Sequence, residues 1–287
     1  MRAAPAGARG SDAYVSQFNL TFVSEYPAKN KNNGAPTCQI QGQPYVSGIG
    51  VDVSGNVWIP QGAPSSSVTT EFAPNCGKAL FSIPDTDGQP AAIAFDSKHN
   101  VYVENIMGTS SNILGSIDVY KPRSKTPATV LTDSSSFLWF DEAIDALDNV
   151  FAVYSDPNNK GHVIEFAGAK NPSKDLPMSL GFPGGVTFDS AGNLLVVDQD
   201  ARNVSVYAPP FTGPAAAKFA LQADSVPCKF NHSMKQLYCA DFTNASIDVY
   251  NYDASNPGST KYAYSFSNGI QRGSENAGIA LSPAPPN

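Results

Sequence analysis

The sequence predicts an all-β protein, a six-bladed β-propeller with four antiparallel strands in each blade. Three observations lead to this prediction. A turn motif recurs at intervals of 42 to 49 residues, apolar strand-like stretches flank each copy, and the two ends of the chain carry complementary parts of one repeat. Repeats of about 40 to 45 residues that hold four short strands are typical of propeller blades.

The composition agrees with a chain of strands and turns. Of the 287 residues, 41% are hydrophobic and only 15% are charged, while glycine and proline each occur 23 times. This balance disfavours disorder, because enough apolar surface is available to form a core. The net charge of −7 disfavours a nucleic-acid partner. No apolar run approaches the length of about 18 residues that a membrane span requires.

The first two strands of each repeat are joined by the recurring turn motif. An apolar strand leads to Asp, three residues follow, and then Asn opens a second apolar strand. An Asp side chain at the start of such a turn can accept backbone N–H groups, and a Gly or Asn near its end can adopt positive φ. Four full copies begin at Asp52, Asp96, Asp145 and Asp189, and a degenerate fifth begins at Asn231.

Two further strands complete each repeat. The third strand ends on an aromatic residue, which is Phe72, Tyr120, Phe166, Tyr207 or Tyr250. A short fourth strand is expected after each, at residues 79–83, 128–131, 177–180, 217–221 and 262–266.

The sixth blade is expected to combine both ends of the chain. Residues 277–281 resemble a first strand, and residues 14–40 supply the patterns of the other three strands. Pairing these segments would close the ring and remove exposed sheet edges. We therefore expect one propeller domain over residues 12–287, preceded by a flexible segment at residues 1–11.

The four cysteines suggest an oxidising compartment. None of them forms a C-x-x-C pair, so a zinc or thioredoxin-like motif has little support. We expect the disulfides Cys38–Cys76 and Cys228–Cys239, and a secreted or periplasmic protein whose signal peptide is absent from this sequence. Four buried free thiols are the alternative.

The stretch from Phe188 to Asp198, FDSAGNLLVVD, resembles NHL-repeat propellers and the wider group of gluconolactonase-like and strictosidine-synthase-like proteins. In the lactonases of this group, the resemblance implies Glu, Asn and Asp metal ligands at the start of the first strands. The corresponding positions here are Ser47, Ala91, Phe140, Gly184, Val226 and, approximately, Asn276. A shift of one or two residues would bring in Asp141, Glu142 and Glu275.

The direction of the chain predicts where a site would lie. Loops before the first strands and after the second strands meet at one face of the ring, which we call the top face. Candidate ligand-binding residues in these loops are Trp139, Phe140, Glu104, Asn105, Asp198, Asp241, Arg272 and Asn276. The alternatives are that the polar members are solvated or brace turns, and that Trp139 packs between blades.

Two functions are compatible with these features. The first is an extracytoplasmic, monomeric binding or interaction module that takes a small polar molecule, a carbohydrate or a protein at the top face. The second is a hydrolase of ester or lactone bonds with its site at the top of the central channel, for which Ca²⁺ is a candidate cofactor. Its candidate catalytic residues are Asp141, Glu142 and Glu275, and its candidate metal ligands are Glu142, Glu275 and Asn276.

Overall fold

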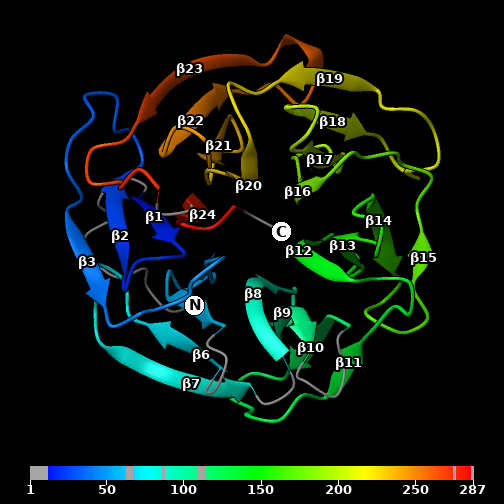
Figure 1. The fold of residues 1–287 in the computed structure, drawn as a ribbon, viewed down its shortest axis with the longest axis horizontal. Helices are drawn as coiled ribbons and strands as arrows, with labels where there is room; N and C mark the ends of the chain where they lie inside the picture. Colours follow the sequence, from blue (N-terminus) through cyan, green and yellow to red (C-terminus); the bar gives the residue numbers. More distant parts are fainter. Residues whose placement is uncertain (1–11, 63–66, 86–87, 109–113, 274–275, 286–287) are drawn as a thin grey trace, which may run out of the picture.

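The computed structural model describes residues 12–62, 67–85, 88–108, 114–273 and 276–285. Six four-stranded antiparallel sheets surround a central axis as the blades of a propeller (Figure 1). The fold is the six-bladed β-propeller that the repeats predict. The N-terminal segment 1–11 lies outside the described residues.

Blades 1 to 5 follow one another along the chain, each running from an inner to an outer strand. Blade 1 contains β4 (Gly50–Val51), β5 (Val57–Gln61), β6 (Ser67–Phe72) and β7 (Ala79–Asp85). Blade 2 contains β8 (Gly88–Phe95), β9 (Val101–Gly108), β10 (Ser116–Tyr120) and β11 (Thr129–Leu131). Blade 3 contains β12 (Leu138–Ile144), β13 (Val150–Ser155), β14 (Gly161–Phe166) and β15 (Lys174–Asp175). Blade 4 contains β16 (Pro183–Phe188), β17 (Leu194–Asp198), β18 (Asn203–Tyr207) and β19 (Ala217–Ala220). Blade 5 contains β20 (Ser225–Phe230), β21 (Gln236–Asp241), β22 (Ser246–Asn251) and β23 (Lys261–Phe266).

Blade 6 joins the two ends of the chain. Its inner strand is β24 (Asn276–Ser282), and β1 (Asp12–Gln17), β2 (Phe22–Pro27) and β3 (Cys38–Gln41) follow outward. Figure 1 shows β24, in red, beside β1, in blue, and the two strands pair in antiparallel register. The ring therefore closes as the sequence predicts.

The repeated Asp has the same structural role in four blades. In blade 2, Asp96 Oδ1 accepts the N–H groups of Lys98 and Asn100, and Asp96 Oδ2 accepts the side-chain amide of Asn100. The residue before the Asn has positive φ in each copy, as at His99 with φ 62°. Equivalent bonds are made by Asp52, Asp145 and Asp189.

The hydrophobic core lies between the blades. Among the described residues, a separate cluster of buried side chains fills each interface between neighbouring blades. Blade 3 departs from the expected strand positions, since its fourth strand is Lys174–Asp175 rather than 177–180. Met178 and Leu180 are 8% and 4% exposed and pack into the core between blades 3 and 4, and the segment keeps only an isolated bridge to β14, between Leu180 and Gly161.

Both expected disulfides are present. Cys228 and Cys239 face each other on β20 and β21, whereas Cys38 on β3 bonds to Cys76 in the connection between β6 and β7. The second bond thus fastens blade 6 to blade 1. Helical structure in the described part of the chain is the 3₁₀ turn η1 (Pro257–Ser259), and no helix there is long and apolar enough to cross a membrane.

We predict that Asp96→Ala lowers the free energy of unfolding by about 3 kcal/mol, because two backbone N–H groups, the Asn100 amide and the Tyr102 hydroxyl lose the buried Asp96 carboxylate as their acceptor. Asp253→Ala is the matched control, since Asp253 is exposed and bonds only within its own turn to Ser255. Urea denaturation should show a loss below about 1 kcal/mol for the control. Equal losses in the two variants would contradict the role assigned to the repeated Asp.

Candidate functional site

Two cavities lie along the axis of the ring. The upper cavity, about 350 Å³, is bordered by residues before the first strands and after the second strands, and so lies at the top face. The lower cavity, about 780 Å³, is bordered by the Asp turns at the other end. Both are lined by Ile49, Ile93 and Lys229, so they meet at the level of these residues. Cavities of about 300 to 1,000 Å³ accommodate small molecules.

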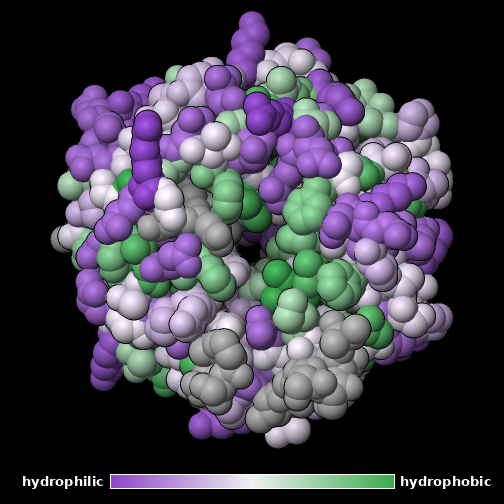
Figure 2. Space-filling model, in the orientation of Figure 1, coloured by the Kyte–Doolittle hydropathy of each residue, from purple (hydrophilic) through white to green (hydrophobic). Residues whose placement is uncertain are grey.

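The upper cavity is mainly apolar. Phe140 and Phe182 pack edge to face, with ring centroids 5.0 Å apart. Further apolar lining comes from Phe18, Ile106, Pro227 and Phe242, and Phe242 is 44% exposed. Figure 2 shows a hollow at the centre of the ring with apolar residues on part of its border. This end of the channel therefore offers aromatic surface to a ligand.

An ion pair connects blades 3 and 5 at this level of the channel. Lys229 Nζ on β20 lies 2.8 Å from both carboxylate oxygens of Asp141 on β12. The Val186 N–H on β16 donates to Asp141 Oδ2 at 3.0 Å. A Cβ atom on Gly185 would lie 2.8 Å from Asp141 Oδ2, so the absence of a side chain there gives the carboxylate its space. The pair puts fixed charge beside otherwise apolar walls.

A second pair of acidic side chains lies beside this ion pair. Glu104 on β9 and Glu142 on β12 are 0% and 1% exposed, and their carboxyl groups neighbour each other. No described residue other than this pair donates a side-chain hydrogen bond to their four oxygens. Two carboxylates can hydrogen-bond to each other only when a proton lies between them. Since four unpartnered buried oxygens disfavour two ionised carboxylates, we expect the pair to retain a proton.

The charge balance of the cluster supports the retained proton. Burial, followed by the neighbouring Glu142 and Asp141 charges, raises the pKa of Glu104 well above its usual range. Burial and the Asp141 charge do the same to the pKa of Glu142. Burial also raises the pKa of Asp141, but the Lys229 ammonium opposes that rise. One cation among three buried acids favours ionisation of the acid that it contacts and protonation of the other pair.

All four members of the cluster interrupt the repeat, and Asp141 stands where other first strands have Gly48, Ala92, Gly185 and Pro227. When the repeats are aligned on their turns, Lys229 stands where other first strands have Gly50, Ala94, Ala143 and Thr187. Glu142 replaces Ile49, Ile93, Val186 and Cys228, and Glu104 replaces Pro60, Val153, Val197 and Ala240. Lys229 was missed among the candidate residues, although a charge inside a degenerate repeat was the signal that could have identified it.

The sequence-predicted candidates have varied surroundings. Trp139, Phe140 and Asp141 line the upper cavity, and Trp139 is fully buried and stacks on Phe166 at 6.0 Å. Glu142 lines the lower cavity. Glu104 and Asn105 are both 0% exposed and border neither cavity.

The remaining residues predicted from the sequence line neither cavity, and one of them lies outside the described residues. Asp198 accepts the N–H groups of Gly181 and Ala201, and Asp241 accepts the N–H and the side-chain amide of Asn244, so both carboxylates brace loops. Arg272 is exposed to solvent. Asn276 pairs with Gln17 through β24 and β1, and Glu275 lies outside the described residues.

Four first-strand starts line the upper cavity, namely Ser47, Ala91, Phe140 and Val226. The resemblance to lactonases implies metal ligands at these positions. None of the four carries a carboxylate, and Ser47 alone has a side-chain oxygen. The described first strands therefore place an apolar surface where the resemblance implies oxygen ligands.

Comparison with solved structures supports the architecture. A chain in the crystal structure of a nidogen/laminin complex superposes with a TM-score of 0.77 at 18% identity, covering 96% of this chain and 100% of that one. A putative 6-phosphogluconolactonase from Bacteroides uniformis gives 0.61 at 11% identity, covering 91% and 84%. A streptogramin B lyase structure gives 0.56 at 13% identity, covering 91% and 76%.

These likenesses show the β-propeller fold and nothing finer, because all of the identities are low. The proteins with this architecture include one that occurs in a protein complex and others with enzyme names. No family model matches the chain, and no curated protein matches it.

We predict that the Glu104–Glu142 pair makes stability depend on pH. An unfolded glutamate loses its proton near pH 4.5, whereas the folded pair retains a proton to a much higher pH. The free energy of unfolding should therefore fall as pH rises from 4.5 toward the folded pKa, by about 1.4 kcal/mol per pH unit for each retained proton. In the double variant Glu104→Gln/Glu142→Gln, the free energy of unfolding should no longer show the fall with pH that this retained proton causes.

Urea denaturation at a series of pH values measures the slope. Glu165→Gln on β14 is the control, and it should keep the wild-type slope. An unchanged slope in the double variant would contradict the retained proton.

Proposed function

We propose that the protein is a binding module whose upper cavity holds a small amphipathic molecule. The apolar part of the ligand packs among Phe140, Phe182 and Phe242, and its polar end lies toward the Asp141–Lys229 pair. The observation that carries the proposal is an apolar cavity of about 350 Å³ with the Asp141–Lys229 ion pair in its lining. The sequence predicts a polar ligand. The apolar lining of the upper cavity adds the requirement that this ligand also has a substantial apolar part.

Phe242 distinguishes the upper cavity from the lower one. In the lower lining, Phe151, Phe211 and Phe230 are buried, and Phe95 and Phe188 are half-buried and pack against the cores between blades. Phe140 and Phe182 are only half-buried, and Phe242 is 44% exposed. Partly exposed aromatic side chains gain the most from a ligand that removes them from water.

We also propose an extracytoplasmic location and an NHL-type repeat for this protein. The two disulfides favour an extracytoplasmic protein. The Asp–x₃–Asn turns, with their shared hydrogen bonds, favour an NHL-type repeat within the propeller fold. We further propose that the protein acts as a monomer, which sedimentation equilibrium can test.

Binding of 1-anilinonaphthalene-8-sulfonate tests the proposed site, because this probe joins an aromatic body to one anionic group. The native protein should bind one equivalent, with a fluorescence increase that saturates. Phe182→Ala should weaken binding about tenfold, because it removes apolar contact area worth more than 1 kcal/mol. Leu147→Ala is the control, since Leu147 is 79% exposed at the other end of the channel. Equal affinities in wild type and Phe182→Ala would contradict the site.

The alternative function is a Ca²⁺-assisted lactonase or esterase using Asp141, Glu142, Glu275 and Asn276. In this structure Asp141 contacts Lys229, and Glu142 neighbours Glu104. These contacts engage carboxyl groups that a cation would require, and for that reason we place the binding module first.

Assays of lactone and ester hydrolysis, with Ca²⁺ and with a chelator, separate the two functions. We expect no turnover above the buffer rate in either condition. Turnover that disappears in chelator and in Glu142→Gln would overturn the binding module in favour of the hydrolase.

A further inference from the structure

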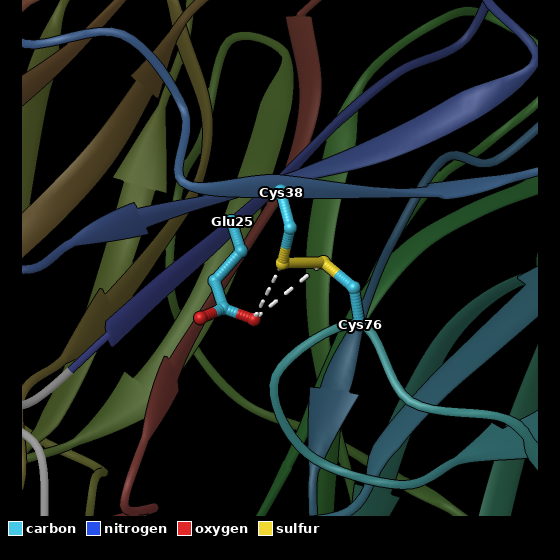
Figure 3. A group of neighbouring side chains, drawn as sticks. All are labelled: Glu25, Cys38 and Cys76. Atoms are coloured by element: carbon cyan, nitrogen blue, oxygen red, sulfur yellow. Dashed lines mark hydrogen bonds between the residues drawn. A yellow bond between two sulfur atoms is a disulfide. The ribbon is translucent and has the colours of Figure 1, made fainter.

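A carboxylate lies against the disulfide that joins blades 6 and 1. Figure 3 shows Glu25 Oε2 pointing at both sulfurs, 3.4 Å from Cys38 Sγ and 3.6 Å from Cys76 Sγ. Glu25 on β2 is the cross-strand neighbour of Cys38 on β3. The ligand atoms of all three residues lie within 4.8 Å of one another. Three groups that can bind a metal thus meet at one seam of the ring.

The carboxylate is held in this position from its other side. Tyr14 on β1 faces Glu25 across the strand pair. The Asn75 N–H donates to Tyr14 Oη at 3.3 Å. Glu25 is 3% exposed, so its carboxylate has little freedom to turn away.

The spacing matches a tetrahedral metal site once the sulfurs separate. Zinc–sulfur and zinc–oxygen bonds of about 2.3 and 2.1 Å at tetrahedral angles place sulfur and oxygen about 3.6 Å apart. The two Glu25 contacts, at 3.4 and 3.6 Å, already have this length. The sulfurs must move to about 3.8 Å from each other. The Cα atoms of the two cysteines are 6.2 Å apart, so side-chain rotation can provide that separation.

We propose that Glu25, Cys38 and Cys76 form a redox-controlled site for a thiophilic divalent cation such as Zn²⁺. The site is closed to metal in the disulfide form, because both sulfurs are then bonded to each other. Reduction opens it, and water completes the coordination. The inference is independent of the upper cavity, because it concerns the seam between blades 6 and 1.

A dithiol can reduce the Cys38–Cys76 disulfide and so open the site. Two electrons and two protons pass from the dithiol to the Cys38–Cys76 bond, which becomes two thiols while the dithiol becomes a disulfide. Metal binding then releases both thiol protons to solvent. Two thiolates and one carboxylate bind the dication, so the occupied site has a net charge of −1. The metal would restore the link between blades 6 and 1 that reduction breaks.

The two disulfides differ in accessibility. Cys228 and Cys239 are 1% and 0% exposed, whereas Cys38 and Cys76 are half-buried. A reductant under native conditions should therefore reach Cys38–Cys76 first. Mass mapping after alkylation with iodoacetamide should find the label on Cys38 and Cys76. Labelling of Cys228 and Cys239 in their place would overturn the proposal.

Cobalt(II) provides the spectroscopic test of the site. The protein is reduced with dithiothreitol, desalted without oxygen and titrated with Co²⁺. We expect one equivalent to bind with thiolate-to-cobalt charge-transfer absorption, and we expect Zn²⁺ to displace it. The oxidised protein and the variant Cys38→Ser/Cys76→Ser should give no such band.

The variant Glu25→Gln keeps both cysteines but loses the carboxylate ligand, so its reduced form should bind Co²⁺ at least tenfold more weakly than wild type. Glu165→Gln on β14 is the matched control and should bind as wild type. The proposal is overturned if the reduced wild type gives no charge-transfer band, or if Glu25→Gln binds as tightly as wild type.

Discussion

The pairing of β24 with β1 is the constraint on which the rest of the molecule depends. It joins the last described strand to the first, with Ala13 opposite Leu281 and Val15 opposite Ile279. Without this pairing, blade 6 would be incomplete and two sheet edges would be exposed. Closure also places an inner strand of every blade around one axis. The channel, both of its cavities and the ion pair across it exist because the ring is closed.

Regular and irregular parts of the repeat have different roles. The regular parts, the Asp turns and apolar strands, build blades that bury their side chains against each other. The irregular parts are charged residues in inner or adjacent strands, and Glu104, Asp141, Glu142 and Lys229 gather beside the channel. Burial of the three acids Glu104, Asp141 and Glu142 is costly unless their charges are neutralised. Lys229 neutralises Asp141 in an ion pair, and we expect a retained proton to lower the charge of the Glu104–Glu142 pair.

The fold was predictable because its determinants are local and repeated. The Asp turns, the strand pattern and the split sixth blade can all be identified along the chain. The Cys228–Cys239 pair follows from its two adjacent strands, which leaves Cys38 to pair with Cys76. The positions of side chains in the channel were less predictable. Asp141 contacts Lys229, 88 residues further along the chain, and no local pattern encodes that contact. Asp198 and Asp241 belong to the predicted acidic top face, but their oxygens bind the N–H groups of neighbouring loops.

The central claim is that the closed ring forms a ligand site at the top face, with apolar walls and an ion pair beside them. A crystal structure of the protein with bound 1-anilinonaphthalene-8-sulfonate tests it most directly. The account predicts electron density for the probe in the upper cavity, with its rings against Phe140 and Phe182 and its sulfonate toward Lys229. Density confined to the lower cavity or to the outer surface, with the upper cavity empty, would contradict the account.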